Sequence, residues 1–251
     1  NSPAITAINK HQGRRNMRRR KKLIIAILLV ILIGLIAVIA GELFLPHDNE
    51  LAQGSKNILV CAIDESEPRP GMGACDMAFI VSLQDGELVN YTEIYPHGMT
   101  HPNASEPQEA QEQGAGEKLL LHDSFWDNDT KKSMQLAQEI VEYNTSENID
   151  AVVAVNSEAL DAILKSAGTL DVNGTQMNAS GIDIIREEQY TGGQTRGAAV
   201  MDIVKAAGHA ASDPLKKAEM VNAALDQYSK GNIVMDPPGA FVGLLASKGI
   251  N

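Results

Sequence analysis

Basic residues are scarce beyond the first fifth of the sequence. Of 21 basic and 32 acidic residues in the chain, eight basic and three acidic residues lie in 1–50, which leaves 13 and 29 in 51–251, a net charge of −16. This acidity excludes nucleic acid as an expected partner, because binding a polyanion there would need a local basic pocket or a metal ion. The same acidity also fits a surface that is simply kept soluble.

Cysteine and the common catalytic fingerprints are also rare. The only cysteines are Cys61 and Cys75, and they form neither a CxxC motif nor a zinc-binding spacing. They lie in two apolar runs separated by a short Pro/Gly loop, which leaves open either a disulfide or two buried thiols. No Ser-His-Asp or Cys-His spacing indicates a hydrolase, and no Walker or dinucleotide-binding fingerprint is present.

Charge is wholly absent from residues 23–41, which are 19 apolar or glycine residues. At the helical rise this stretch spans roughly the ~30 Å hydrocarbon core of a bilayer, so we predict a transmembrane helix. A cleaved signal peptide is the alternative, because Val38 and Ala40 are small residues at a suitable place for cleavage. The apolar run is longer than the roughly 7–15 residues typical of a signal peptide, which favours the uncleaved anchor.

The flanking charges predict the orientation of this anchor. Residues 1–22 carry eight basic and no acidic side chains, whereas residues 42–50 carry three acidic and no basic ones. The positive-inside rule then makes 1–22 a basic cytoplasmic tail, with 42–55 as a linker and 56–251 as an extracytoplasmic domain. We therefore expect a single-pass protein of the cell membrane, with the lipid bilayer as a partner.

The first part of the domain reads as strands. The runs 57–63, 77–83 and 87–94 are rich in strand-forming residues, and Asp85-Gly86 between the last two predicts an antiparallel hairpin. Residues 95–116 are polar and lack periodicity, so we expect a long exposed loop that also exposes His97 and His101.

Helices alternate with strands in the rest of the domain. The patterns predict a mixed sheet with helices on both faces, an α-β-α sandwich of the α/β class. Asp129, Ser157 and Asp213 are expected to cap helices, and Gly168 to end one. The expected helices cover 130–143, 157–167, 181–189, 194–211, 214–229 and a short segment ending at 247; the expected strands cover 151–155, 170–172 and 232–235.

N-glycosylation sequons are more frequent than chance suggests. None lies in the predicted tail or anchor, which fits an external domain, although a single sequon is a weak signal. The six sequons begin at Asn90, Asn103, Asn128, Asn144, Asn173 and Asn178.

Four stretches of the domain resemble a family known as domain of unknown function 4012, which groups membrane-anchored surface proteins of bacteria and archaea. Together they span most of 57–251, although the family itself implies no established activity. The stretches are the Glu67–Gly73 loop, similar to Glu-x-Arg-Pro-x-Gly-Gly; His122–Asp129, similar to Asp-x-x-Trp-x-x-Asp; Ile149–Asn156, similar to Asp-Gly-Val-x-x-x-Asp; and Ile163–Gly174, similar to Leu-Leu-x-x-x-Gly-Pro-Val, with Thr169 where proline is usual.

A more distant resemblance is to the LytR-CpsA-Psr enzymes, which transfer glycopolymers from polyprenyl pyrophosphate lipids onto cell walls. Asn57–Asp64 is similar to their opening strand, and Cys75–Leu83 to their Ser-Asp-Thr-Met strand, whose aspartate helps to hold a divalent ion. The sequence departs from that family in having no arginine before Asp76 and Tyr95-Pro96-His97 in place of Pro-Arg-Asp.

The resemblance implies a Mg²⁺ ion held by Asp64 and Asp76, and catalytic roles for Asp76, Arg186 and Arg196. The only arginines after residue 50 are Arg69, Arg186 and Arg196. A guanidinium group offers a fixed fork of donors that suits a diphosphate, so these three are the candidate substrate-binding residues. The alternative is that each arginine forms ordinary ion pairs on an acidic surface.

Two other groups have competing interpretations. Asp127 and Asp129, with His122 and Asp123, could bind a metal, but Asp129 is more simply a helix cap. Trp126 could stack on a sugar ring or serve as a core or lid aromatic. Two functions follow for the chain: a transferase acting on polyprenyl-pyrophosphate-linked glycans, or a non-catalytic module that binds an envelope glycan or protein.

Overall fold

The structure is a computed structural model that describes residues 50–67, 69–177, 202–203, 206–211 and 213–238. The predicted anchor at 23–41, the helices at 181–189 and near the chain end, and most of the helix at 194–211 lie outside these residues. So do Arg186 and Arg196. None of the helices within the described ranges is both long and apolar enough to span a bilayer.

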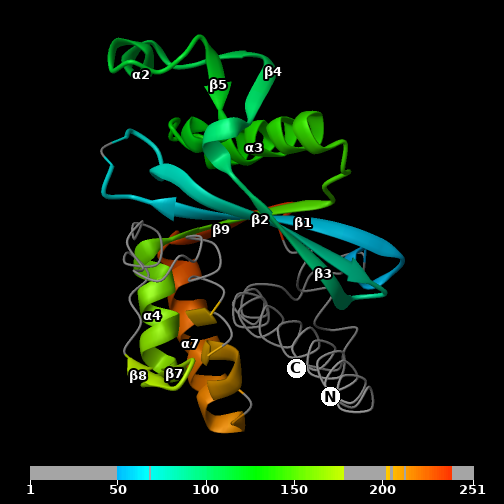
Figure 1. The fold of residues 1–251 in the computed structure, drawn as a ribbon, viewed down its shortest axis with the longest axis vertical. Helices are drawn as coiled ribbons and strands as arrows, with labels where there is room; N and C mark the ends of the chain where they lie inside the picture. The colour runs from blue at the N-terminus through cyan, green and yellow to red at the C-terminus, as the bar shows by residue number, and fades with distance from the viewer. Residues whose placement is uncertain (1–49, 68, 178–201, 204–205, 212, 239–251) are drawn as a thin grey trace, which may run out of the picture.

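A five-stranded mixed sheet forms the centre of the domain, as predicted (Figure 1). The central strand β1 runs parallel to β6 and antiparallel to β2, while β3 and β9 form the two edges. The strand formers of β1 and the six fully buried residues of β6 explain why these two strands occupy the middle. The strands, in spatial order, are β3 (Glu87–Ile94), β2 (Ala74–Gln84), β1 (Ser55–Asp64), β6 (Ala151–Asn156) and β9 (Ile233–Asp236).

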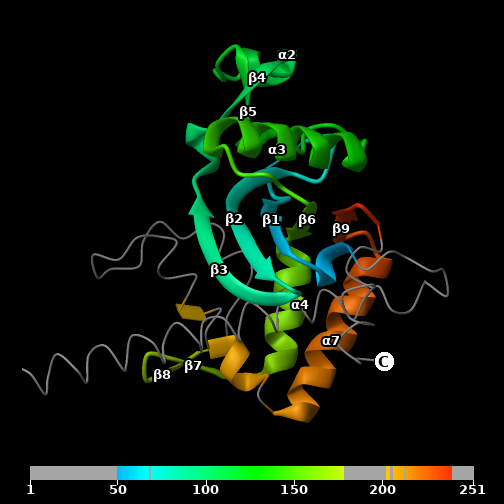
Figure 2. The ribbon, with the colours of Figure 1, turned by 90° about the vertical axis from the view of Figure 1, so that its right-hand side faces the viewer.

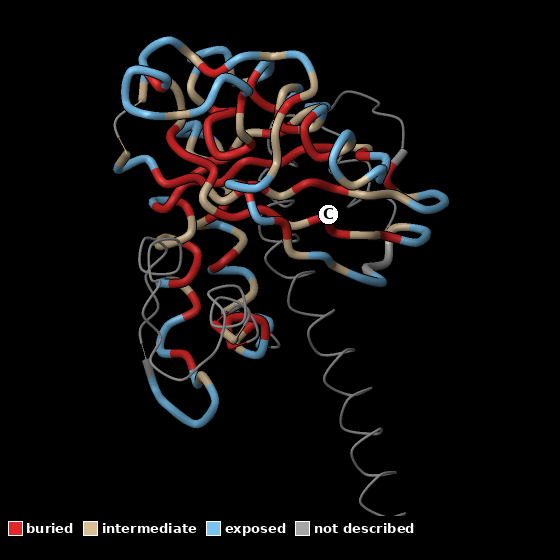
Figure 3. Tube along the Cα trace, turned by 45° about the horizontal axis from the view of Figure 1, so that its top comes forward, coloured by how far each residue is buried: buried red, intermediate tan, exposed pale blue. Residues whose placement is uncertain are grey.

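Helices cover both faces of the sheet, which confirms the predicted layers (Figures 1 and 2). Helix α3 (Thr130–Thr145) lies on one face, and α4 (Ser157–Ala167) and α7 (Pro214–Ser229) lie on the other. Buried residues run through the centre of the molecule (Figure 3) and form one apolar cluster on each side of the sheet. Smaller elements are η2 (Glu50–Ala52), η3 (Pro96–Gly98), β4 (Thr100–Ser105), α2 (Gln108–Glu112), β5 (Lys118–Leu120), η4 (Leu121–Asp123), β7 (Leu170–Val172) and β8 (Thr175–Met177).

The ends of the helices follow the sequence signals with one exception. Asp129 caps α3 by accepting the Lys132 N–H at 3.0 Å, and Asp213 caps α7. Gly168, at φ 77°, ends α4. The prediction that Ser157 caps α4 is wrong, because Asn156 is the cap and accepts the Ala159 N–H at 3.0 Å.

Glu65 explains the displaced cap. Its carboxylate accepts the Ser157 hydroxyl and the backbone N–H groups of Ser157 and Glu158, at 3.0 Å and 3.2 Å for the two N–H groups. Ser157 therefore lies in the first turn of α4 and donates its hydroxyl to a distant side chain instead of accepting from its own helix.

The expectation of a long exposed loop over 95–116 is wrong. The segment contains η3, β4 and α2, and β4 packs on α3 and pairs with β5. His101 of β4 is only 5% exposed. Its Nδ1 accepts the N–H groups of Asn103 and Ala104, and its Nε2 lies 2.7 Å from the Glu139 carboxylate. Because hydrogen bonds allow this polar ring to be buried, the segment folds without a hydrophobic periodicity that the sequence could show.

The two cysteines are free, buried thiols, which settles the alternative left open by the sequence. Cys61 pairs with Ala78 and Cys75 with Ile63 in the β1–β2 register, so the two residues are not directly opposite each other. Both belong to the apolar cluster beneath α3.

Candidate functional site

Two segments far apart in the sequence meet beside strand β2. The β1–β2 loop (residues 64–67 and 69–73) packs on the η4 segment (residues 121–127), and the Gly71 N–H donates to the Trp126 carbonyl at 2.8 Å. A Cβ on Gly71 would lie 2.3 Å from the carbonyl oxygens of Phe125 and Asp127. The close approach of the two backbones therefore requires glycine at position 71.

Arg69 joins these segments through its guanidinium group. Its Nη1 donates to Glu67 Oε2 at 2.8 Å, and its Nε donates to Asp123 Oδ1 at 3.1 Å, with a further contact from Nη2 to the same oxygen. The guanidinium carbon lies 5.2 Å from the centre of the Trp126 ring. Burial opposes the charge, but the hydrogen bonds to Glu67 and Asp123 leave the pKa of Arg69 above its ordinary value.

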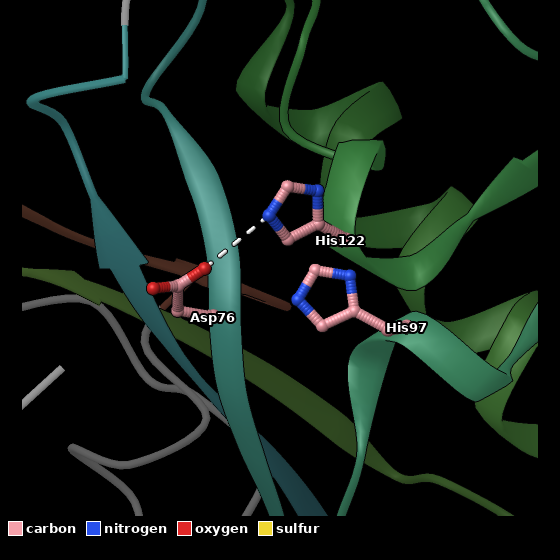
Figure 4. A group of neighbouring side chains, drawn as sticks. All are labelled: Asp76, His97 and His122. Carbon is pink, nitrogen blue, oxygen red and sulfur yellow. Dashed lines mark ion pairs between the residues drawn. The ribbon is translucent and has the colours of Figure 1, made fainter. Parts of the chain in front are cut away.

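His122 is held between two carboxylates. Its Nε2 lies 3.2 Å from Asp76 Oδ1 (Figure 4). Its Nδ1 lies 3.3 Å from Asp123 Oδ1. Burial opposes protonation, but the hydrogen bonds with Asp123 and Asp76 raise the pKa of His122 to about 9. Burial likewise opposes ionisation of Asp123, yet His122 and Arg69 lower its pKa. At neutral pH the anionic Asp123 therefore lies between two cations, His122 and Arg69.

A second imidazole lies against the first. The His97 ring, from η3, has its centre 4.3 Å from that of His122 with an interplanar angle of 31°. Figure 4 shows a nitrogen of each ring on the side facing Asp76. Burial and the neighbouring His122 cation lower the pKa of His97, so this ring is neutral where His122 is charged. His97 is exposed, as predicted, but no pattern in the sequence indicated that it contacts His122.

Three carboxylates converge next to the imidazoles. One oxygen each from Asp64, Glu67 and Asp76 lies within 4.8 Å of the others. Asp64 ends β1, is only 2% exposed and accepts the Ser66 N–H at 2.8 Å. Asp76 is the third residue of β2 and lies where the β1–β2 register shifts, with its Oδ1 3.2 Å from His122 Nε2. Strand geometry therefore sets both aspartates at one end of the sheet.

The structure thus brings together part of the predicted site. Asp64 and Asp76 lie side by side, as a shared metal ion would require, and their role as ligands stays a prediction. Arg69 is close to them, but two carboxylates already engage its guanidinium. The remaining predicted residues, Arg186 and Arg196, lie outside the described residues, so their position relative to this cluster stays a prediction.

The other sequence candidates separate into different roles. Asp129 caps α3, and Asp127 forms an exposed ion pair with Lys132 at 3.2 Å. In the described residues, neither belongs to a group that could hold a metal ion. Trp126 is half-buried beneath Arg69. This favours the interpretation as a core or lid aromatic over an open surface for stacking on a sugar.

Sequence reasoning missed two members of the cluster, Glu67 and His97, and it grouped His122 with Asp127 and Asp129 instead of with Asp76. Glu67 and His122 both lie within stretches that resemble the family motifs, which was the available signal. His97 had no signal of its own, because it follows the edge strand β3 in a polar segment.

Comparison with known proteins identifies the family. The model for proteins of unknown function named DUF4012 matches residues 53–190, more than half of the chain, and the chain belongs to this family. Among curated proteins, none matches the sequence. The geometry explains two motifs of the chain, because the Glu67–Gly73 loop and the Asp123–Asp129 segment are the two stretches joined by Arg69.

Solved structures with a similar fold come from several bacteria. The protein gbs0355 from Streptococcus agalactiae has 14% identity and a TM-score of 0.52, covering 81% of this chain and 76% of its own. The transcriptional regulator EF0465 from Enterococcus faecalis has 13% identity and a TM-score of 0.50, covering 82% and 74%. TagV from Bacillus subtilis has 15% identity and a TM-score of 0.49, covering 79% of each chain.

These neighbours are LytR-CpsA-Psr-like proteins, which confirms the distant likeness expected from the sequence. Identities this low establish a shared fold alone.

Proposed function

We propose that this protein works in the cell envelope and transfers a glycopolymer from a polyprenyl diphosphate lipid to an envelope acceptor. The observation that carries the proposal is the convergence of Asp64 and Asp76 where β1 ends and β2 begins. In the LytR-CpsA-Psr enzymes the resembling strand supplies an aspartate to a divalent ion. The predicted anchor at 23–41 would keep residues 56–251 outside the cell, close to a lipid-borne substrate.

The donors at this position suit Mg²⁺. The ion prefers oxygen ligands and commonly uses one or two carboxylates together with substrate phosphates. Asp64 and Asp76 would hold it, with Glu67 beside them. When bound, the ion would offset the negative charge of a diphosphate next to these carboxylates.

The chain's own residues would orient this site. Arg69 fixes Glu67 and Asp123, and Asp123 in turn holds His122 against Asp76. Arg186 and Arg196 would contact the diphosphate through their guanidinium groups, as the resemblance implies. Glycan transfer then depends on binding and orientation by groups from both halves of the domain.

A non-catalytic glycan- or protein-binding module is the second candidate. One observation favours it: the guanidinium of Arg69 is engaged by Glu67 and Asp123, with a side chain only 7% exposed. Within the described part of the chain, this is the sole arginine, and it serves to join two segments rather than to face a ligand.

Native mass spectrometry of the full chain in detergent, with a polyprenyl diphosphate and with or without Mg²⁺, tests the proposal. We expect Mg²⁺-dependent binding that is lost in Asp76→Asn, Arg186→Ala and Arg196→Ala. Glu109→Gln, which removes one exposed negative charge on α2, is the matched control and should bind normally.

A transfer assay with the bound lipid separates the two candidates. Release of the lipid monophosphate, with the glycan and its phosphate moved to an acceptor, supports the phosphotransferase, whereas binding without turnover supports the module. No binding by a folded wild-type chain would overturn the lipid-diphosphate proposal.

A further inference from the structure

The two histidines and Asp76 form a group with a different chemistry from the carboxylates. One ligand atom each of Asp76, His97 and His122 lies within 4.8 Å of the others. They come from β2, η3 and η4, three elements that contact one another. Figure 4 shows both rings presenting a nitrogen toward the Asp76 carboxylate. We propose that Asp76, His97 and His122 bind a first-row transition metal ion such as Zn²⁺.

The ligand types select this class of metal. Imidazole nitrogen suits zinc, copper, iron and nickel, whereas Mg²⁺ and Ca²⁺ take oxygen ligands. Two histidines and one carboxylate are a recurrent set for zinc and for ferrous iron, and three protein ligands leave a coordination position for water or an oxyanion. The group is thus chemically distinct from Asp64 and Glu67, although Asp76 belongs to both.

An outer shell of hydrogen bonds supports the assignment independently. A metal-binding histidine usually has its second nitrogen held by a carboxylate, which fixes the orientation of the ring. His122 Nδ1 lies 3.3 Å from Asp123 Oδ1, while Nε2 faces Asp76. Arg69 donates to the same Asp123 oxygen, and its Nη2 lies 3.3 Å from His122 Nδ1. The ring is therefore oriented before any metal arrives.

A metal ion can reach this group from solvent, and the proton that it displaces can leave. His97 is exposed, so an ion can reach the group from solvent. Binding replaces the contact between His122 Nε2 and Asp76, and a proton carried by that nitrogen leaves to solvent. No oxidation or group transfer takes part in this step.

Co²⁺ titration of the chelator-treated full chain in detergent tests the site, because Co²⁺ reports nitrogen ligands by its visible absorption. We expect one tight Co²⁺ per chain, displaced by Zn²⁺. His97→Ala and His122→Ala should each weaken Co²⁺ binding at least about 100-fold, and Asp123→Asn roughly 10–100-fold as an outer-shell change. His209→Ala, the loss of an exposed histidine elsewhere, is the matched control and should leave binding unchanged.

The His97 variant keeps the test decisive, because this exposed side chain can be removed without leaving a buried cavity. Co²⁺ affinity unchanged by His97→Ala, or the absence of a tight site in folded wild type, would overturn the proposal. Asp64→Asn separates this site from the proposed Mg²⁺ site: it should abolish Mg²⁺-dependent lipid binding and change Co²⁺ affinity less than about threefold. Lipid binding that survives in His97→Ala would leave the proposed function intact.

Discussion

The two faces of the sheet bury different kinds of polar side chain. Among the described residues, the buried polar side chains of α4, α7 and the end of β6 are the neutral Asn156, Ser157 and Gln227, which bond to helix ends and neighbouring turns. On the α3 side the buried polar groups include ionisable ones: His101, Glu106, His122 and Asp123.

This difference shows where the fold supports charge. Burying an ionised side chain is unfavourable unless partners satisfy it. On the α3 side, short 3-10 turns and loops replace part of a helical cover, and their backbone and side-chain groups supply those partners. The α3 side is therefore the face on which ligand chemistry can be built, whereas the α4–α7 face contributes stability.

The largest expected effect comes from removing the charge that joins the two segments. Arg69→Met leaves Asp123 buried next to His122 alone, and we expect a loss of about 3–5 kcal/mol in the free energy of unfolding. Lys230→Met breaks an exposed ion pair with Asp226 on the opposite face and should leave the unfolding midpoint unchanged. Urea unfolding of both variants checks this. Equal midpoints for both variants would refute the contrast between the faces.

Glu106 gives the next largest effect, and it depends on pH. Its Oε1 accepts the Leu120 N–H at 2.6 Å, while Oε2 is buried without a hydrogen-bond partner. Burial raises the pKa of Glu106 to about 7, above its value in the unfolded chain. Its contribution to stability is therefore present below about pH 4.5 and is lost as the pH rises toward 7.

Glu106→Gln should remove this pH dependence. The variant should gain stability over wild type between pH 4.5 and 8, by up to about 3 kcal/mol at the upper end. Thermal unfolding at several pH values measures the difference. A gap between the two proteins that does not change with pH would contradict the assignment.

Gly71→Ala should have a smaller effect of about 1–3 kcal/mol on stability, because the added Cβ forces the two segments apart. Gly116→Ala is the matched control, since a Cβ there meets nothing within 4 Å. Calorimetry compares their stabilities, and Co²⁺ titration should show weaker binding in the Gly71 variant only. Unchanged stability in both would mean that the contact at Gly71 does not constrain the site.

The smallest effect belongs to the α7 side. Asp213→Ala removes the cap of α7, whose carboxylate accepts the Leu215 N–H at 2.8 Å, and should reduce stability by about 1 kcal/mol. Metal and lipid binding should be unchanged, because α7 covers the face of the sheet opposite α3, and η4, which carries His122, contacts α3. Denaturant unfolding and Co²⁺ titration together check this, and a loss of Co²⁺ binding would show that the faces are coupled.

Local signals in the sequence predicted most of the fold. The apolar runs predicted the strands, and Asp85-Gly86 predicted the hairpin between two of them. Asp129, Asp213 and Gly168 predicted helix ends. These predictions succeeded because each signal acts within a few residues. The layered mixed sheet followed from their alternation. The prediction for 95–116 was wrong, because the segment has no periodic pattern and His101 is buried through a contact with Glu139, 38 residues away.

The residues of the site could be predicted only where the sequence resembles a known family. Asp64 and Asp76 were identified through the resembling strands. For Arg69 the sequence left open substrate binding or an ordinary ion pair, because its partner Asp123 lies 54 residues away and nothing local shows that the two meet. His97 and His122 likewise come together only through the packing of η3 on η4.

The parallel pairing of β1 with β6 has a consequence for how this domain could vary. Every described member of the cluster, from Asp64 to Asp123, lies in the one chain segment that runs from the end of β1 to the start of β6. The described residues after β6 form α4, β7, β8, α7 and β9, and none of them belongs to the cluster. A circular permutant opened at the exposed Asn173-Gly174 turn would therefore keep the cluster on one uninterrupted stretch of chain.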